Sequence, residues 1–215
     1  MHYPKKLAVA LTAATLLFTL AACGDDGDTN DAHAEQTAAN GEVFNDPDVD
    51  FASAMIPHHA QALAMVDLTR GRELSPQLKQ LTEDIQAAQG PEIEKMVDWL
   101  TEWDQPVPET MRDHANADDP DGMGHDMDDP DGDDPTDSAM PGMMTDEELA
   151  DLGAAHGQEF EDMWLEMMIE HHEGAIEMAQ DEQADGVFQP AIDLAESIET
   201  SQRAEIDHMR ELLAS

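Results

Sequence analysis

The chain has 215 residues, of which 50 are Asp or Glu and only 9 are Lys or Arg, giving a formal net charge of −41. This charge argues against nucleic-acid binding, which needs a basic surface, and against adhesion to anionic lipid. The single cysteine excludes an internal disulfide, so thioether and imidazole are the soft metal ligands that 15 methionines and 10 histidines can supply.

Residues 1–22 are predicted to be a lipoprotein signal peptide. Two lysines precede an apolar run from Leu7 to Leu20, which is too short to favour a transmembrane span. The run ends in Leu-Ala-Ala-Cys at residues 20–23, which looks like a bacterial lipobox. Cys23 is therefore predicted to carry a lipid that anchors the exported protein to the outer side of the cell membrane without spanning it. An ordinary secretory signal with an incidental cysteine is the alternative.

Residues 23–45 are predicted to be a flexible acidic tether, because Asp, Ala, Gly, Thr and Asn dominate them. Asp46-Pro47 is a helix-start signal, and the folded part is expected to begin there.

An internal repeat organises the rest of the chain. The sequence Met-Ile-x-His-His-x-x-Ala-x-x-Met occurs around His58-His59 and again around His171-His172, at an offset of 171 − 58 = 113 positions. The offset continues into a second block, where it pairs Leu81 with Leu194, Gln89 with Gln202, Glu92 with Glu205, and Met96 with Met209. Each copy contains two segments with apolar residues at helical spacing. The prediction is an all-α, four-helix bundle made of two repeated helical hairpins, residues 46–103 and 146–215.

Residues 104–145 lack a helical period and are predicted to be a disordered acidic linker between the repeats. Its methionines and histidines could gather ions loosely: Met123, His125, Met127, Met140, Met143 and Met144. Pro57 and Pro91 lie inside helical patterns and predict kinks rather than helix ends. Ser75-Pro76 and Thr145 are predicted to begin helices.

The two histidine pairs form the candidate metal site. On a helical wheel both histidines of each pair fall inside the apolar arc, whereas Gln61 falls opposite. Burying four imidazoles costs free energy unless each has a partner, and a metal ion supplies one. Six methionines project to the same side: Met55, Met65, Met96, Met168, Met178 and Met209. Imidazole with thioether, outside the cytoplasm and without cysteine, favours copper as Cu(I) or Cu(II).

Further residues accompany this set. His208, next to Met209, is a candidate for another nitrogen ligand. Gln89 and Glu92, with their counterparts Gln202 and Glu205, share the buried face and are expected to lie beside the ligands.

Three other interpretations stay open. The histidines could form a hydrogen-bonded network without metal, or the chain could be a structural or partner-binding protein of the cell surface. A di-iron oxidase would need Glu-x-x-His on two helices. Glu205 and His208 provide it once, but Lys95 replaces the histidine after Glu92. We therefore predict a metal-binding protein rather than an enzyme.

The repeated His-His motif, with Gln-x-x-Glu-Ile-x-x-Met downstream in both copies, resembles domain-of-unknown-function family 305 over roughly Asp46 to Leu213, the linker excepted. The resemblance implies a ferritin-like helical bundle, often exported, with some members linked to copper binding and tolerance. It implies a copper role for the histidine pairs and the flanking methionines. The expected function is copper sequestration or buffering. The long acidic linker departs from compact members and leaves the placement of the two repeats open.

Overall fold

The computed structural model describes residues 34–110 and 140–215, so the predictions for the signal peptide, Cys23 and most of the linker lie outside the described residues. The described helices are α1 (Asp46–Asp67), α2 (Pro76–Glu102), α4 (Asp146–Ala154), α5 (Gln158–Asp185) and α6 (Gln189–Leu213). Two short antiparallel strands, β1 (Gln36–Thr37) and β2 (Val43–Phe44), precede them. No helix in these two ranges combines the length and apolar character needed to cross a membrane.

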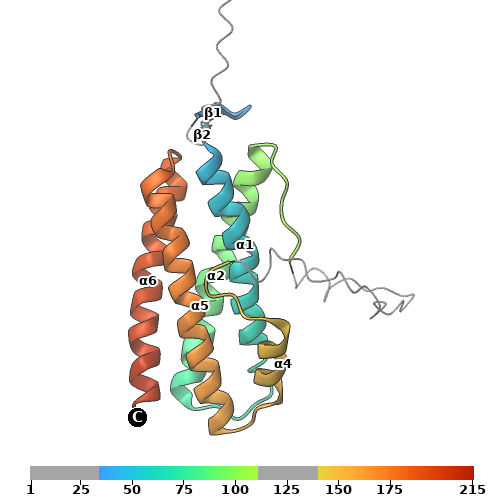
Figure 1. Cartoon of the computed structure of the whole chain (residues 1–215), viewed down its shortest axis with the longest axis vertical. Helices are drawn as coiled ribbons and strands as arrows, with labels where there is room; N and C mark the ends of the chain where they lie inside the picture. Colours follow the sequence, from blue (N-terminus) through green and yellow to red (C-terminus); the bar gives the residue numbers. More distant parts are fainter. Residues whose placement is uncertain (1–33, 111–139) are drawn as a thin grey trace, which may run out of the picture. The chain divides into compact units, whose positions relative to one another are not determined.

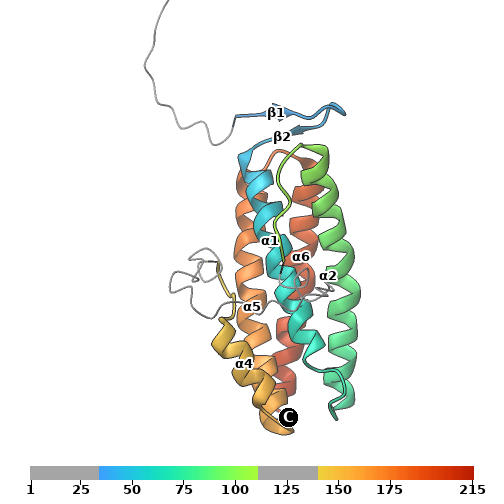
Figure 2. The ribbon, with the colours of Figure 1, turned by 90° about the vertical axis from the view of Figure 1, so that its right-hand side faces the viewer.

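The four long helices form the predicted bundle of two hairpins. α1 packs against α2, α5 packs against α6, and α1 and α5 join the hairpins, while α2 and α6 touch more sparsely (Figures 1 and 2). Adding the offset of 113 to the first residues of α1 and α2, Asp46 and Pro76, gives Glu159 and Gln189. Gln189 is the first residue of α6, and Glu159 is the second residue of α5. The predicted all-α fold and the duplication are therefore confirmed.

Local capping fixes where the helices begin. Asn45 caps α1 in a capping box with Asp48, and Thr145 caps α4 in another with Glu148. The Ser75 side chain accepts the Leu78 N–H at the start of α2, as its position before proline predicts. α1 and α2 continue through the prolines at 57 and 91, so neither proline ends its helix.

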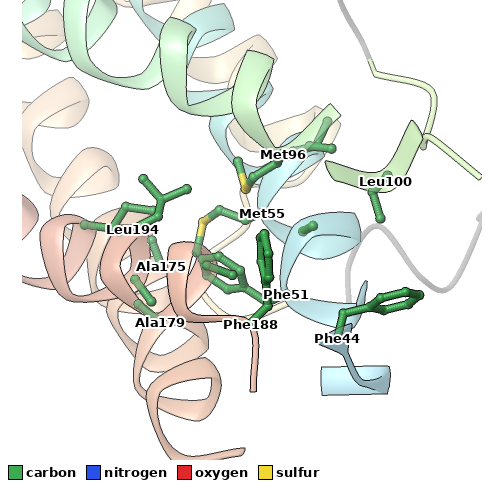
Figure 3. Close-up of a cluster of buried hydrophobic side chains, with 14 of the residues drawn as sticks. Phe44, Phe51, Met55, Met96, Leu100, Ala175, Ala179, Phe188 and Leu194 are labelled. Carbon is green, nitrogen blue, oxygen red and sulfur yellow. The ribbon is translucent and has the colours of Figure 1, made fainter. Parts of the chain in front are cut away.

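Two clusters of buried apolar side chains fill the bundle. The first joins the start of α1, the end of α2, the end of α5 and the start of α6, with Met55, Met96, Ala175 and Leu194 among its members (Figure 3). The second joins the opposite halves of the same helices and includes Met65, Leu81, Met168, Trp164 and Met209. Each of the four long helices carries buried polar side chains between its members of the two clusters, so a polar layer crosses the middle of the bundle.

The tether prediction for residues 23–45 is wrong for its last part. β1 and β2 form a small hairpin, and the Phe44 ring stacks on Trp103 at 4.6 Å with an interplanar angle of 5°. Phe44 is only 3% exposed, because it joins the first apolar cluster. The hairpin thus closes the end of the bundle where α1 begins (Figure 1).

The linker prediction also fails at its C-terminal end. Residues 140–145 pack on α1 and α5 and lead directly into α4. Arg72 then fixes the connection from α4 to α5: its guanidinium donates to the carbonyls of Gly153 and Ala155 and lies 4.0 Å over the Phe160 ring. The helix α4 is therefore tied to the turn between α1 and α2.

A carboxyl pair joins the start of α1 to the turn between α5 and α6. The Asp48 carboxylate accepts backbone N–H groups of Asn45, Val187 and Phe188. In the part of the chain that the structure describes, no N–H group reaches the Glu182 oxygens, which face Asp48 instead. Burial first, then the hydrogen bond and charge of Asp48, raise the pKa of Glu182 from 4.5 to about 9. The proton shared by the pair therefore resides on Glu182 at neutral pH.

Candidate metal centre

The polar layer contains both histidine pairs and their predicted neighbours. The four imidazoles are 0% exposed, although each side chain is polar. α2 contributes Gln89 and Glu92 to the layer, and α6 contributes Gln202 and Glu205. The structure thus gathers, on one level of the bundle, the four histidines and the four residues predicted to lie beside them.

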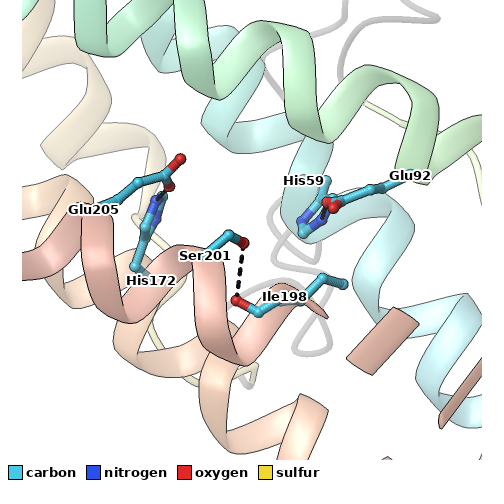
Figure 4. Close-up of polar contacts among 6 residues, drawn as sticks. All are labelled: His59, Glu92, His172, Ile198, Ser201 and Glu205. Carbon is cyan, nitrogen blue, oxygen red and sulfur yellow. Dashed lines mark hydrogen bonds and ion pairs between the residues drawn. The ribbon is translucent and has the colours of Figure 1, made fainter. Parts of the chain in front are cut away.

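The second histidine of each pair is held by a glutamate of its own hairpin (Figure 4). Nε2 of His59 lies 2.8 Å from Glu92 Oε2, and Nε2 of His172 lies 2.6 Å from Glu205 Oε2. An ionised carboxylate only accepts hydrogen bonds, so in both imidazoles the proton lies on Nε2. Nδ1 of both rings then carries a lone pair, and neither Nδ1 atom has a hydrogen-bond partner.

The first histidines of the two pairs meet across the interface between α1 and α5. The ring centroids of His58 and His171 lie 3.8 Å apart with an interplanar angle of 42°. Nε2 of His58 donates to the Pro141 carbonyl at 3.0 Å, which leaves its Nδ1 unpartnered. Neither ring nitrogen of His171 forms a regular hydrogen bond. A centroid distance of 3.8 Å leaves no room for an ion between the ring faces, so a ligand would bind at the ring edges.

Both of these imidazoles are held in the neutral form. Burial, followed by the neighbouring imidazole of His59, lowers the pKa of His58 to about 3. Burial also lowers the pKa of His171 well below 6.5, with His58, His172 and His59 acting in the same direction. A neutral imidazole offers a lone pair to a metal without first losing a proton.

Among the residues that the structure describes, five buried ring nitrogens in the layer have no hydrogen-bond partner of regular geometry: Nδ1 of His58, His59 and His172, and both nitrogens of His171. Each unsatisfied polar group costs about 1–3 kcal/mol, so such a concentration calls for a ligand or a function. Within residues 34–110 and 140–215, no three His, Cys, Asp or Glu side chains already converge as a metal-binding group.

The six predicted methionines lie in or against the two apolar clusters on either side of the layer, and their burial differs. Met55 and Met168, each one helical turn before the first histidine of its pair, are 0% exposed and belong to different apolar clusters. Met65, Met96 and Met209 are equally buried, whereas Met178 is half-buried. His208 does not join the layer, because its side chain is exposed next to buried Met209. The wheel places these two neighbours about 100° apart, and only one can face the core.

Sequence reasoning missed three residues that complete the site. Pro141 supplies the carbonyl that accepts from His58, although its sequence context predicts a disordered linker. Gln61 was placed on the solvent face, yet it is 2% exposed and bonds to Met144. Gly174 lies where Pro141 approaches α5. The one available signal was that a glycine interrupts an otherwise helix-favouring segment, which often marks a close backbone contact.

The fold and this layer define a class of protein: a bundle of two duplicated helical hairpins with buried, paired histidines at its centre. The chain belongs to the family described as Domain of unknown function (DUF305), whose model matches residues 48–213. A comparison with curated proteins finds no match.

Solved structures share the fold. A DUF305 protein from Streptomyces coelicolor has 32% identity and a TM-score of 0.62, covering 78% of this chain and 92% of its own. A DUF305 fragment from Deinococcus radiodurans has 26% identity and a TM-score of 0.64, covering 83% and 99%. CopM in its Cu(II)-bound form has 28% identity and a TM-score of 0.58, covering 78% and 95%. CopM has also been solved in Cu(I)-bound and Ag-bound forms.

Proposed function

We propose that this chain binds copper in the polar layer and sequesters or buffers it outside the cytoplasm. The observation that carries the proposal is the set of five buried ring nitrogens without hydrogen-bond partners. Burial without a partner is unfavourable for an imidazole, and coordination of a metal ion compensates for it. The similarity to CopM, which has been solved with copper and with silver, supports the same choice of metal.

Cu(I) fits the donor set better than Cu(II). The buried candidates are imidazole nitrogens and thioether sulfurs, and thioether selects Cu(I), whereas Cu(II) prefers a tetragonal set of nitrogen and oxygen ligands. The two carboxylates of the layer, Glu92 and Glu205, are already engaged by His59 and His172. Such histidine–carboxylate pairs orient an imidazole toward a metal bound at its other nitrogen.

The di-iron alternative lacks support at the position it needs most. Its only Glu-x-x-His match ends at His208, whose side chain is exposed. The glutamates of the layer face histidines, and residues 34–110 and 140–215 do not bring together the carboxylates and histidines that a di-iron site needs. We therefore propose a binding protein and not an oxidase.

The proposed function includes export and attachment to the membrane through Cys23, since residues 20–23 read as a lipobox. Replacing Cys23 by Ser should abolish lipidation and release or misprocess the protein. Cell fractionation measures this. If the variant were processed normally and stayed in the membrane fraction, the predicted lipid anchor would be wrong.

Copper titration of the purified domain tests the central part. Cu(I) is competed against a chelator in a buffer containing excess Mg²⁺, which occupies the acidic surface because Mg²⁺ prefers oxygen ligands. Replacing all four layer histidines by Ala should remove high-affinity binding. The matched control replaces the exposed His156 and His208 by Ala and should bind like the wild type. A purely structural network predicts the opposite: a lower melting temperature of the metal-free quadruple variant with unchanged copper affinity.

A further inference from the structure

A segment outside both repeats reaches the metal centre. Residues 140–145, called here the clamp segment, run from the end of the acidic linker into α4 (Figure 1). The segment turns at Pro141-Gly142, where the Met143 N–H donates to the Met140 carbonyl at 3.3 Å. Gly142 has φ +74, the value that the third position of a type II turn requires, and Pro141 occupies the second position that proline favours. The turn therefore has a defined conformation of its own.

Two residues hold the clamp segment against the bundle. The Gln61 amide donates to the Met144 carbonyl at 2.8 Å and accepts the Met144 N–H at 2.7 Å, and all these groups are buried. On the other side of the segment, Pro141 lies against Gly174 so closely that a Cβ atom at residue 174 would overlap the Pro141 carbonyl. One residue thus holds the segment by hydrogen bonds, and the other by having no side chain.

Gln61 and Gly174 occupy the same position in the two repeats, since 174 − 61 = 113. Immediately after a duplication, equivalent positions of the two copies carry the same residue. Here they carry different residues, and each of the two fits the clamp segment in its own way. The asymmetry extends to the histidines that are also equivalent. His58 donates to the clamp segment through Nε2, whereas His171 does not bond to that segment; the backbone acceptor that faces it is that of His58, and no bond of regular geometry forms within the described residues.

The Pro141 carbonyl does for His58 what the two glutamates do for His59 and His172. A carbonyl oxygen only accepts, so the His58 proton must lie on Nε2 and the lone pair on Nδ1. Metal-ligating histidines almost always donate their other N–H to a carboxylate or a backbone carbonyl, which fixes the tautomer and the ring orientation. Three of the four imidazoles in the layer show this arrangement, and their bare nitrogen is Nδ1 in each case.

We propose that the clamp segment is a positioning element of the copper centre. By accepting the Nε2–H of His58 it fixes the tautomer of this imidazole, so His58 binds copper through Nδ1. The tautomer of His171, the equivalent histidine of the second repeat, is not fixed in this way. This inference rests on the proposed copper function. It assigns a role to residues that belong to neither repeat, and it predicts that the two halves of a duplicated site bind metal unequally.

Gly174→Ala tests the proposal, because the added methyl group must displace the Pro141 carbonyl. Gly90→Ala is the matched control: Gly90 is also helical and adjoins Gln89 of the layer, but a Cβ atom there meets nothing within 4 Å. A second test variant, Gln61→Leu, removes both bonds to Met144 at similar side-chain volume and adds no thioether. Neither test residue is a proposed metal ligand.

Two measurements are made on each variant. The first is the tautomer of His58 in the metal-free protein, read from two-bond ¹H–¹⁵N correlations of the labelled imidazole. We expect Nε2–H in the wild type and in Gly90→Ala, and loss of that single tautomer in both test variants. The second is Cu(I) affinity, which should fall about ten- to a hundredfold in the test variants, the usual effect of removing a partner that orients a ligand.

The outcomes separate the two proposals. An unchanged His58 tautomer, or a copper affinity of Gly174→Ala and Gln61→Leu equal to that of Gly90→Ala, overturns the role of the clamp segment and leaves the copper function intact. Failure of the wild-type chain to bind copper overturns the proposed function itself, whatever the tautomer of His58.

Discussion

Replacing Glu182 by Gln should stabilise the protein at neutral and alkaline pH and flatten its stability profile. The Glu182 pKa is raised from 4.5 in the unfolded chain to about 9 in the fold, so between these values the folded state holds a proton that the unfolded state has lost. Stability is therefore fully present below the unfolded value and declines as pH rises through this window, by at most about 1.4 kcal/mol per pH unit. Gln keeps a donor for Asp48 without this linkage.

The magnitude follows from the surroundings of the pair. From pH 4.5 to about 7.5 the linkage amounts to at most about 4 kcal/mol. Glu182 is 1% exposed, but it lines a pocket of about 420 Å³ together with Asp50, Asp181 and Asp185, and water in that pocket screens the charge. We expect a gain of about 1–3 kcal/mol in the free energy of unfolding near pH 7.5.

Urea unfolding at a series of pH values between about 5 and 8.5 measures the free energy of unfolding of both proteins. Linkage predicts that it falls with rising pH more steeply in the wild type than in Glu182→Gln. The control is Glu177→Gln, an exposed position on the same helix, which removes one negative charge from the acidic surface without touching the pair. Identical pH slopes for the two variants would refute the account of the Asp48–Glu182 pair.

Three further predictions concern the bundle and its layer. Arg72→Ala should lower the free energy of unfolding by about 2–4 kcal/mol, measured in urea, because it leaves backbone carbonyls without their donor; an effect below about 1 kcal/mol would contradict this. Phe44→Ala should cost about 3 kcal/mol and shift the fluorescence of Trp103 to the red, as the stacked ring is lost; unchanged emission would argue against the hairpin packing. Glu205→Gln should weaken Cu(I) binding about tenfold in a competition titration, because the amide no longer fixes the tautomer of His172; wild-type affinity would count against that role.

The repeat made much of the fold predictable from the sequence. A constant offset of 113 demands the same faces in both copies, and helical spacing alone then turns all four histidines toward the interior. In the structure the paired imidazoles lie inside the bundle, and the four neighbours on α2 and α6 lie on the same level. The inward position of Glu92 and Glu205 followed from their place on the buried arc, although their specific histidine partners did not.

Irregular segments were not predictable in the same way. The hairpin before α1 contains strands of two residues each, too short to show an alternating pattern. The clamp segment has no period at all, and its position depends on Gln61 and Gly174, residues that contact it across long sequence separations. A helical wheel also assumes that the face opposite the core meets water. That assumption fails for Gln61, because the clamp segment covers it.

The exposure of His208 shows the same limit from the other side. Adjacency to a buried methionine suggested a shared site, but neighbouring residues on a helix point in directions about 100° apart. Met209 takes the inward direction and His208 the outward one. Position within the arc is therefore a better guide to a ligand than proximity in sequence.

Anomalous diffraction at the copper edge, from crystals of the Cu(I)-loaded protein, tests the central claim most directly. The account predicts an anomalous peak inside the bundle at the level of His58 and His171, within bonding distance of imidazole nitrogen, and no peak there in the variant lacking all four layer histidines. Copper found only on surface carboxylates, with the layer histidines unchanged from the metal-free structure, would contradict it.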